Sequence, residues 1–162
     1  MTTLLHKKLS NEYFDFLVKM VELGDNDKHA HGKLLIGAVH HHVQSLGVSG
    51  RIKDLATLES NKHRDKGEHI IPINVIKNAL YDGKIELAKS LFEYSFVADI
   101  SKESNSKLSG SLVKYMPEEF YDKTSELYLN PYARYLKVGI DLYLDDKKLD
   151  LSAYKNSIKG LE

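Results

Sequence analysis

The residues best suited to chemistry lie in one short polar segment, residues 61–72. It contains two histidines, two carboxylates and three basic side chains, and it leads directly into two isoleucines and a proline. Imidazole and carboxylate groups bind divalent metals and transfer protons near neutral pH. His63, Glu68 and His69 are therefore candidate catalytic residues of a metal-assisted hydrolase or nuclease. His40, from another part of the chain, is a candidate to join them.

Residues 68–72 read Glu-His-Ile-Ile-Pro, and they resemble the acidic-His-x-x-Pro opening of HNH-type nucleases. In that family the histidine activates water and its acidic neighbour binds the metal, which implies these roles for His69 and Glu68. The resemblance covers five residues. After Pro72 the chain departs from the family, because a helical pattern follows at once and no later histidine occurs. The final metal ligand would have to be His63 or His40.

A structural role fits the same residues without any metal or cofactor, and no cofactor is expected under it. Glu68 can cap the following helix or accept a hydrogen bond from a loop amide. His69 can donate to a backbone carbonyl while its ring packs against the two isoleucines, as buried polar groups usually do. The sequence alone leaves both interpretations open.

Tyrosines gather in the second half of the chain, where six of the ten lie between residues 115 and 143. Tyrosine is favoured at binding surfaces because it offers a large apolar face and a polar tip at a low entropic cost. We therefore predict a binding surface that includes Tyr121, Tyr128, Tyr132 and Arg134. In the alternative interpretation, the same rings build the smaller half of the core.

Five histidines lie between residues 29 and 42, and their spacing argues against a shared metal ion. Ligands on one helix face need offsets of three or four residues, and no pair here has either offset. His42 is expected to border the core, whereas His41 is expected to be solvated.

Composition excludes several classes of protein. Lysine plus arginine and aspartate plus glutamate both number 23, so the formal net charge is zero. The strong basic field of a non-specific nucleic-acid binder is therefore missing. The chain has no cysteine, which rules out disulfides, thiolate metal sites and a cysteine nucleophile. The N-terminal residues include no apolar run of signal-peptide length.

Helix signals dominate the first hundred residues. The pattern of apolar residues and caps predicts helices at residues 10–23, 27–46, 51–59, 72–83 and 84–94. Ser10 is the expected cap of the first helix. Phe14, Leu17 and Val21 should face inward, and Phe16 and Met20 are further candidates for that face.

The remainder of the chain is more broken. Residues 95–100 fit a short strand or a buried connector, and Ser101 is the expected cap of a brief helix. Residues 104–111 are rich in Ser, Asn and Gly and predict a mobile loop. Pro117 and Pro131 are each expected to open a helical turn, and a last turn is predicted at residues 152–159.

These patterns together predict a mainly α fold, a compact single helical domain over residues 1–162 with at most a minor strand. The expected function is that of a small non-catalytic binding protein, a regulator or inhibitor of a larger macromolecular partner. That partner is expected to be a protein, with nucleic acid as a weaker alternative and no role for a membrane. The cytoplasm is the expected location. Metal-assisted hydrolysis is the alternative function.

Overall fold

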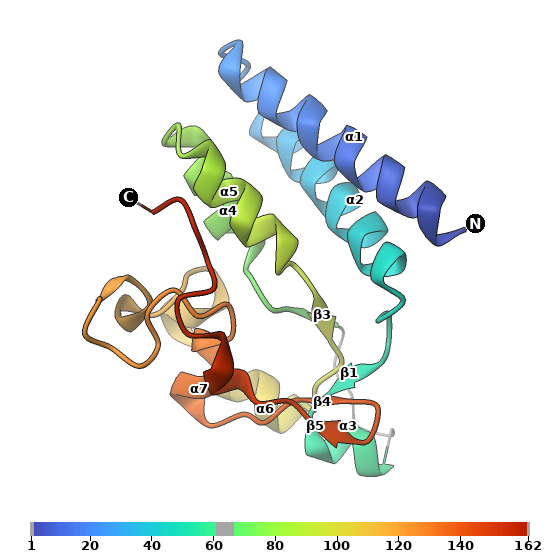
Figure 1. Ribbon diagram of the computed structural model, residues 1–162, viewed down its shortest axis with the longest axis vertical. Helices are drawn as coiled ribbons and strands as arrows, with labels where there is room; N and C mark the ends of the chain where they lie inside the picture. Colours follow the sequence, from blue (N-terminus) through green and yellow to red (C-terminus); the bar gives the residue numbers. More distant parts are fainter. Residues whose placement is uncertain (1, 61–66, 162) are drawn as a thin grey trace.

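The computed structural model describes residues 2–60 and 67–161 (Figure 1). The structure is 56% helical, and strands make up only 8%, so the helix content lies well above the roughly one third of an average globular protein. The expected mainly α fold is therefore confirmed. His63 falls outside the described residues.

Two long antiparallel helices form an outer layer of the molecule (Figure 1). They are α1 (Thr3–Glu22) and α2 (Lys28–Leu46). Asp27 caps α2 through its carboxylate, and Gly47 ends it in the left-handed conformation, as the sequence predicts. The start of α1 was predicted wrongly, because Thr2 is its cap. Ser10 lies inside the helix instead, where its hydroxyl donates to the carbonyl of Ala38 on α2.

Helices α4 (Ile73–Tyr81) and α5 (Ile85–Glu93) pack against this pair. Both were predicted to within a few residues, since Pro72 and Gly83 mark their ends. Phe14 of α1 stacks on Phe92 of α5, with ring centroids 4.4 Å apart. The first core cluster is built around this contact, and its fully buried members include Leu17, Leu35, Ala38, Ile71, Ile76, Ala88, Phe120 and Ala133.

The strands are short and antiparallel. One sheet has the order β1-β4-β5, and its strands are β1 (Ile52–Lys53), β4 (Tyr143–Leu144) and β5 (Lys147–Lys148). The predicted helix at residues 51–59 therefore begins later, as α3 (Leu55–Ser60). The second sheet pairs β2 (Glu68–His69) with β3 (Val97–Ala98).

The second half combines short helices with the second core cluster. Its elements are α6 (Lys102–Lys107), the 3-10 turns η1 (Gly110–Val113) and η2 (Glu118–Tyr121), α7 (Ala133–Val138) and η3 (Leu151–Tyr154). Ser101 caps α6 as predicted. The loop predicted at residues 104–111 is wrong, because α6 and η1 occupy most of it. Tyr135, Leu142 and Ile100 are fully buried in this second cluster.

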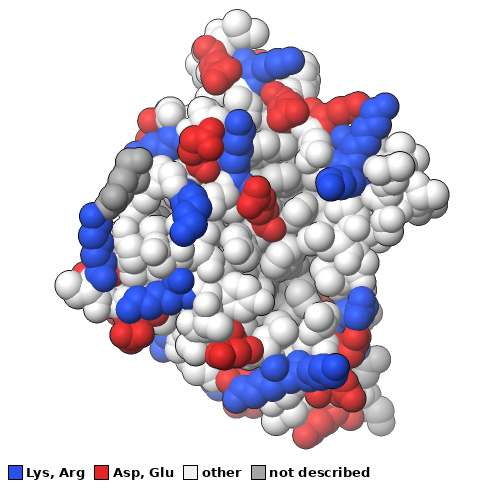
Figure 2. Space-filling model, viewed as in Figure 1, with Lys and Arg blue, Asp and Glu red and all other residues white. Residues whose placement is uncertain are grey.

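The visible surface carries charges of both signs side by side rather than one continuous field (Figure 2). This fits the zero net charge of the sequence. Within residues 2–60 and 67–161, none of the helices combines the length and the apolar character that a membrane span requires.

Candidate functional site

The backbone holds Glu68 and His69 on a two-residue strand next to the second core. Glu68 lies opposite Ala98 and His69 opposite Val97 in the antiparallel β2–β3 pair. The amide of Ile70 extends this pairing by donating to the carbonyl of Phe96. Because side chains alternate along a strand, these two neighbours present their groups to different surroundings.

Glu68 is engaged by a buried cation. The guanidinium of Arg134, on α7, lies 2.8 Å from a carboxylate oxygen of Glu68. The same guanidinium donates to the carbonyls of His69 and Leu112, at 2.8 and 2.7 Å. The Arg134 side chain is fully buried and that of Glu68 is 25% exposed. A buried cation is tolerated only when it is paired in this way, so this carboxylate has a clear structural task.

His69 provides a neutral imidazole close to this ion pair. Burial lowers its pKa, and the Arg134 cation acts in the same direction against the opposing effect of Glu68. Its Nδ1 atom is buried and makes no hydrogen bond within the described part of the chain. The hydroxyl of Tyr135 is likewise buried without a partner there. A neutral imidazole with a free nitrogen can accept a proton or bind a metal.

The other predicted ligands do not gather around Glu68 within the described residues. His63 lies outside them, and His40 is exposed on α2, where its ring packs edge-on against that of His41. Residues 2–60 and 67–161 contain no group of three or more histidines and carboxylates placed to hold a metal ion. His42 borders the core as expected, with its ring against Phe92. His41 is half-buried rather than solvated, with its Nδ1 atom 2.8 Å from that of His6.

Asp54 is a buried carboxylate that links the N-termini of two helices. It was not singled out from the sequence. It accepts hydrogen bonds from the Thr57 amide at the start of α3 and from the amide and hydroxyl of Ser101, the cap of α6. The hydroxyl of Ser104 donates to it as well. Burial by itself would raise the pKa of Asp54, but these hydrogen bonds outweigh burial and lower it to about 2. The available signal was an aspartate directly before the apolar residues of a predicted helix, which is typical of a helix N-cap.

Replacing Asp54 by Asn should remove a pH-dependent part of the stability. The pKa of Asp54 is 3.8 ordinarily and about 2 in the folded chain. The carboxylate therefore stabilises the fold above about pH 4, and this contribution is lost as the pH falls toward 2. We expect the substitution to lower the free energy of unfolding by about 2 kcal/mol at pH 7. Urea denaturation between pH 2 and pH 7 measures both effects.

Asp145→Asn is the control, because Asp145 is an exposed carboxylate paired with Arg51. It should lower the free energy of unfolding far less than Asp54→Asn does, because water and salt screen an exposed ion pair. A profile of Asp54→Asn that parallels the wild type below pH 4 would contradict the assigned role of Asp54.

The four predicted binding residues divide into two groups by burial. Tyr132 is 3% exposed and Arg134 is fully buried, so both face the interior. Tyr121 is 48% exposed and Tyr128 is half-buried. Tyr115, which was not singled out, is 49% exposed. The tyrosine-rich segment thus supplies both core and surface.

Tyr115 and Tyr121 border a groove of about 310 Å³ between their segment and helices α4 and α5. Its apolar lining includes Leu87, Leu91 and Phe120, and its polar lining includes Asp82 and Lys84. An apolar groove with a few polar groups is the usual form of a site for a small molecule or a partner side chain.

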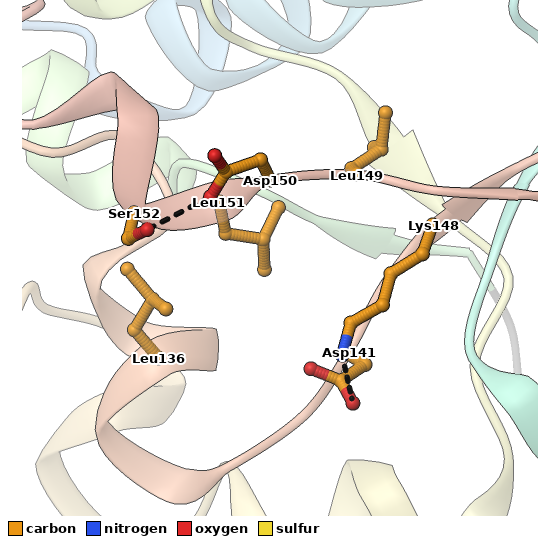
Figure 3. A pocket seen from close by; sticks show the side chains of 7 residues that line it. All are labelled: Leu136, Asp141, Lys148, Leu149, Asp150, Leu151 and Ser152. Carbon is orange, nitrogen blue, oxygen red and sulfur yellow. Dashed lines mark hydrogen bonds and ion pairs between the residues drawn. The ribbon is translucent and has the colours of Figure 1, made fainter.

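A second hollow, of about 390 Å³, lies between α7, β5 and η3 (Figure 3). Its charged groups are already paired, since Lys148 and Asp141 point toward each other across 3.1 Å. The hydroxyl of Ser152 donates to Asp150 in the same way. Because these polar groups already bind one another, the hollow offers few of them to a ligand.

The chain matches no protein-family model, no curated protein and no solved structure. The likeness of residues 68–72 to the HNH opening stays limited to those five residues.

Proposed function

We propose that this chain is a small non-catalytic binding protein that regulates or inhibits a larger protein partner. The observation that carries the proposal is the groove bordered by Tyr115 and Tyr121. Both rings are about half exposed. The covered half of each ring holds it in position, and the exposed half is available to a partner. Such tyrosines contribute strongly to interfaces because ordering them costs little entropy.

The surroundings of the groove suit a protein partner. Leu87 and Leu91 offer an apolar floor for an inserted side chain, while Asp82 and Lys84 provide one charge of each sign. The interspersed charges of the visible surface (Figure 2) also favour a protein over nucleic acid, which requires a continuous basic surface. The pairing of Glu68 with Arg134 supports a structural role for the polar segment.

Replacing Tyr121 by Ala should weaken partner capture without unfolding the chain. A half-exposed ring adds little to stability, but its loss at an interface commonly costs more than about 1 kcal/mol, or roughly fivefold in affinity. The measurement is affinity capture from cell extract with quantitative mass spectrometry, followed by titration of the purified partner. Thermal unfolding of each variant confirms that it remains folded.

The matched control is Leu55→Ala, because Leu55 is an equally exposed apolar residue, 47%, on α3 and outside the groove. It should capture the partner as the wild type does. Equal capture by Tyr115→Ala, Tyr121→Ala and the wild type would remove the groove from consideration as the binding site.

Metal-assisted hydrolysis is a second candidate, favoured by the buried Nδ1 atom of His69. It predicts cleavage of DNA or RNA that requires Mg²⁺, Mn²⁺ or Zn²⁺ and that His69→Ala abolishes in a folded protein. Chelator-treated protein is the baseline for this assay. If none of the three metals produces cleavage above that baseline, the hydrolase candidate fails and the binding proposal is unaffected.

A further inference from the structure

Helix α1 carries a second apolar face in addition to the one that enters the core. The core-facing residues are Phe14, Leu17 and Val18. The second set follows spacings of four, four, three, four and three residues, and its members are Leu5, Leu9, Tyr13, Phe16, Met20 and Leu23. Five helical turns take eighteen residues, so this set forms one straight stripe along the helix. We call it the α1 stripe.

The α1 stripe is open to solvent. Phe16 is 55% exposed, Leu5 is 42% exposed and Leu23 is 87% exposed, while Leu9 and Met20 are half-buried. The expectation that Phe16 faces inward is therefore wrong. On α2, the stripe is bordered by Gly37, where an added Cβ would lie 3.1 Å from the Tyr13 ring. Ile36 beside it is 53% exposed.

We infer that the α1 stripe is the interface of an antiparallel homodimer. Charge complementarity points to a second copy of this chain. Glu12 and Lys19 lie on the same flank of the stripe, displaced from Leu5 by about 20° and 40° around the helix. In an antiparallel pair, the two-fold axis lies close to Phe16 and is perpendicular to both helices. Each flank of the stripe then lies opposite the same flank of the second copy. The axis therefore sets Glu12 of one copy opposite Lys19 of the other, and the same pair repeats by symmetry.

Most apolar residues of the stripe match under the same two-fold axis, while Leu5 extends past the end of α1 of the second copy. Phe16 meets its own copy at the centre, and Leu9 of one helix meets Leu23 of the other. The Tyr13 ring lies between the positions of Phe16 and Met20 of the second copy, which is the interdigitation that packed helices require. An unrelated partner would have to supply this arrangement by coincidence.

The size of the face suits a dimer. Helix α1 has 20 residues and is therefore about 30 Å long. With α2 beside it at about 10 Å, the face is about 20 Å wide and covers about 600 Å². Standard interfaces bury about 800 Å², and at the lower end about 600 Å², on each partner, so this face is large enough for a small interface.

Light scattering after size exclusion tests the inference on the full chain. The wild type should have twice the 18.4 kDa monomer mass. Phe16→Asp should be a folded monomer, because it places a charge at the centre of the interface. Leu55→Asp, at an exposed leucine on α3, should remain a dimer. A monomeric wild type at about 100 µM, or a dimeric Phe16→Asp variant, would overturn the inference.

Charge exchange tests the partner's identity. Glu12→Lys or Lys19→Glu alone should weaken the dimer about tenfold, since each converts two attractive pairs into repulsive ones. The double exchange should restore the wild-type dissociation constant. Failure of this rescue would exclude the antiparallel pairing. If the wild type instead stays monomeric and floats with anionic phospholipid vesicles, the stripe is a membrane-binding face and the dimer is excluded.

Cysteine cross-linking fixes the direction of the two helices, because the natural chain has no cysteine. Phe16→Cys should form a disulfide-linked dimer on oxidation. Leu23→Cys should not, since Leu23 lies opposite Leu9 of the other copy. Efficient cross-linking of Leu23→Cys would show a parallel pair and contradict the inference. None of these outcomes depends on the groove at Tyr121, so the dimer and the proposed function can fail independently.

Discussion

Replacing Arg134 by Met should lower the free energy of unfolding by about 3–5 kcal/mol, because it leaves the Glu68 carboxylate without its cation. The loss is larger than that of an ordinary ion pair because Arg134 is fully buried and its guanidinium also satisfies the carbonyls of His69 and Leu112. The total free energy of unfolding of most domains is only about 5–15 kcal/mol. Urea denaturation monitored by circular dichroism measures the change.

The same substitution at Arg51 is the control. Arg51 binds Asp145 through two hydrogen bonds of 3.0 and 2.6 Å, but both side chains are about half exposed. Arg51→Met should therefore lower the free energy of unfolding far less than Arg134→Met does, because water and salt screen an exposed ion pair. If Arg134→Met and Arg51→Met lowered the free energy of unfolding equally, the burial of Arg134 would add nothing to the strength of its ion pair. The structural role assigned to Arg134 would then be wrong.

Tyr132→Ala should destabilise the fold about as strongly, by about 3–5 kcal/mol, which is typical of removing a large buried ring. Tyr132 is 3% exposed and packs in the second core, with its ring centroid 5.0 Å from that of Tyr154. Thermal and urea unfolding measure the loss. Tyr132→Phe retains the ring and should recover most of the stability.

Tyr121→Ala serves as the matched comparison, since Tyr121 is 48% exposed. We expect it to change the free energy of unfolding by less than about 1 kcal/mol, as is usual for surface substitutions. Equal stability of Tyr132→Ala and Tyr121→Ala would show that the ring of Tyr132 is not a core element.

Local signals in the sequence were sufficient for several helices. Asp27 and Gly47 mark both ends of α2, and Pro72 and Ser101 precede α4 and α6. Each signal acts within one helical turn, which is why a single sequence reveals it. Ser10 misled the prediction of α1, because its hydroxyl bonds to Ala38 on α2 rather than to its own helix. The second apolar stripe of α1 also made Phe16 look like a core residue.

Features that join distant parts of the chain were not predictable from periodicity. Strands of two residues are too short to show alternation, so β4 and β5 were missed. The partners Glu68 and Arg134 are 66 residues apart, and nothing near either residue indicates the other. The sequence pattern placed Glu68 and His69 in one candidate site, but it did not indicate that Arg134 of α7 lies beside them.

The position of Arg134 late in the chain has a consequence for folding during synthesis. Helices α1 to α6 and strand β2 all leave the ribosome before α7 does, because domains emerge from the N-terminus onward. Until α7 emerges, the Glu68 carboxylate lacks its partner Arg134. The carboxylate therefore stays hydrated, and β2 stays outside the apolar interior. The part of the first core that α1, α2, α4 and α5 supply can form earlier, and Phe120 and Ala133 complete it later. The second core must wait for α7, which makes its closure a late step in the maturation of the nascent chain.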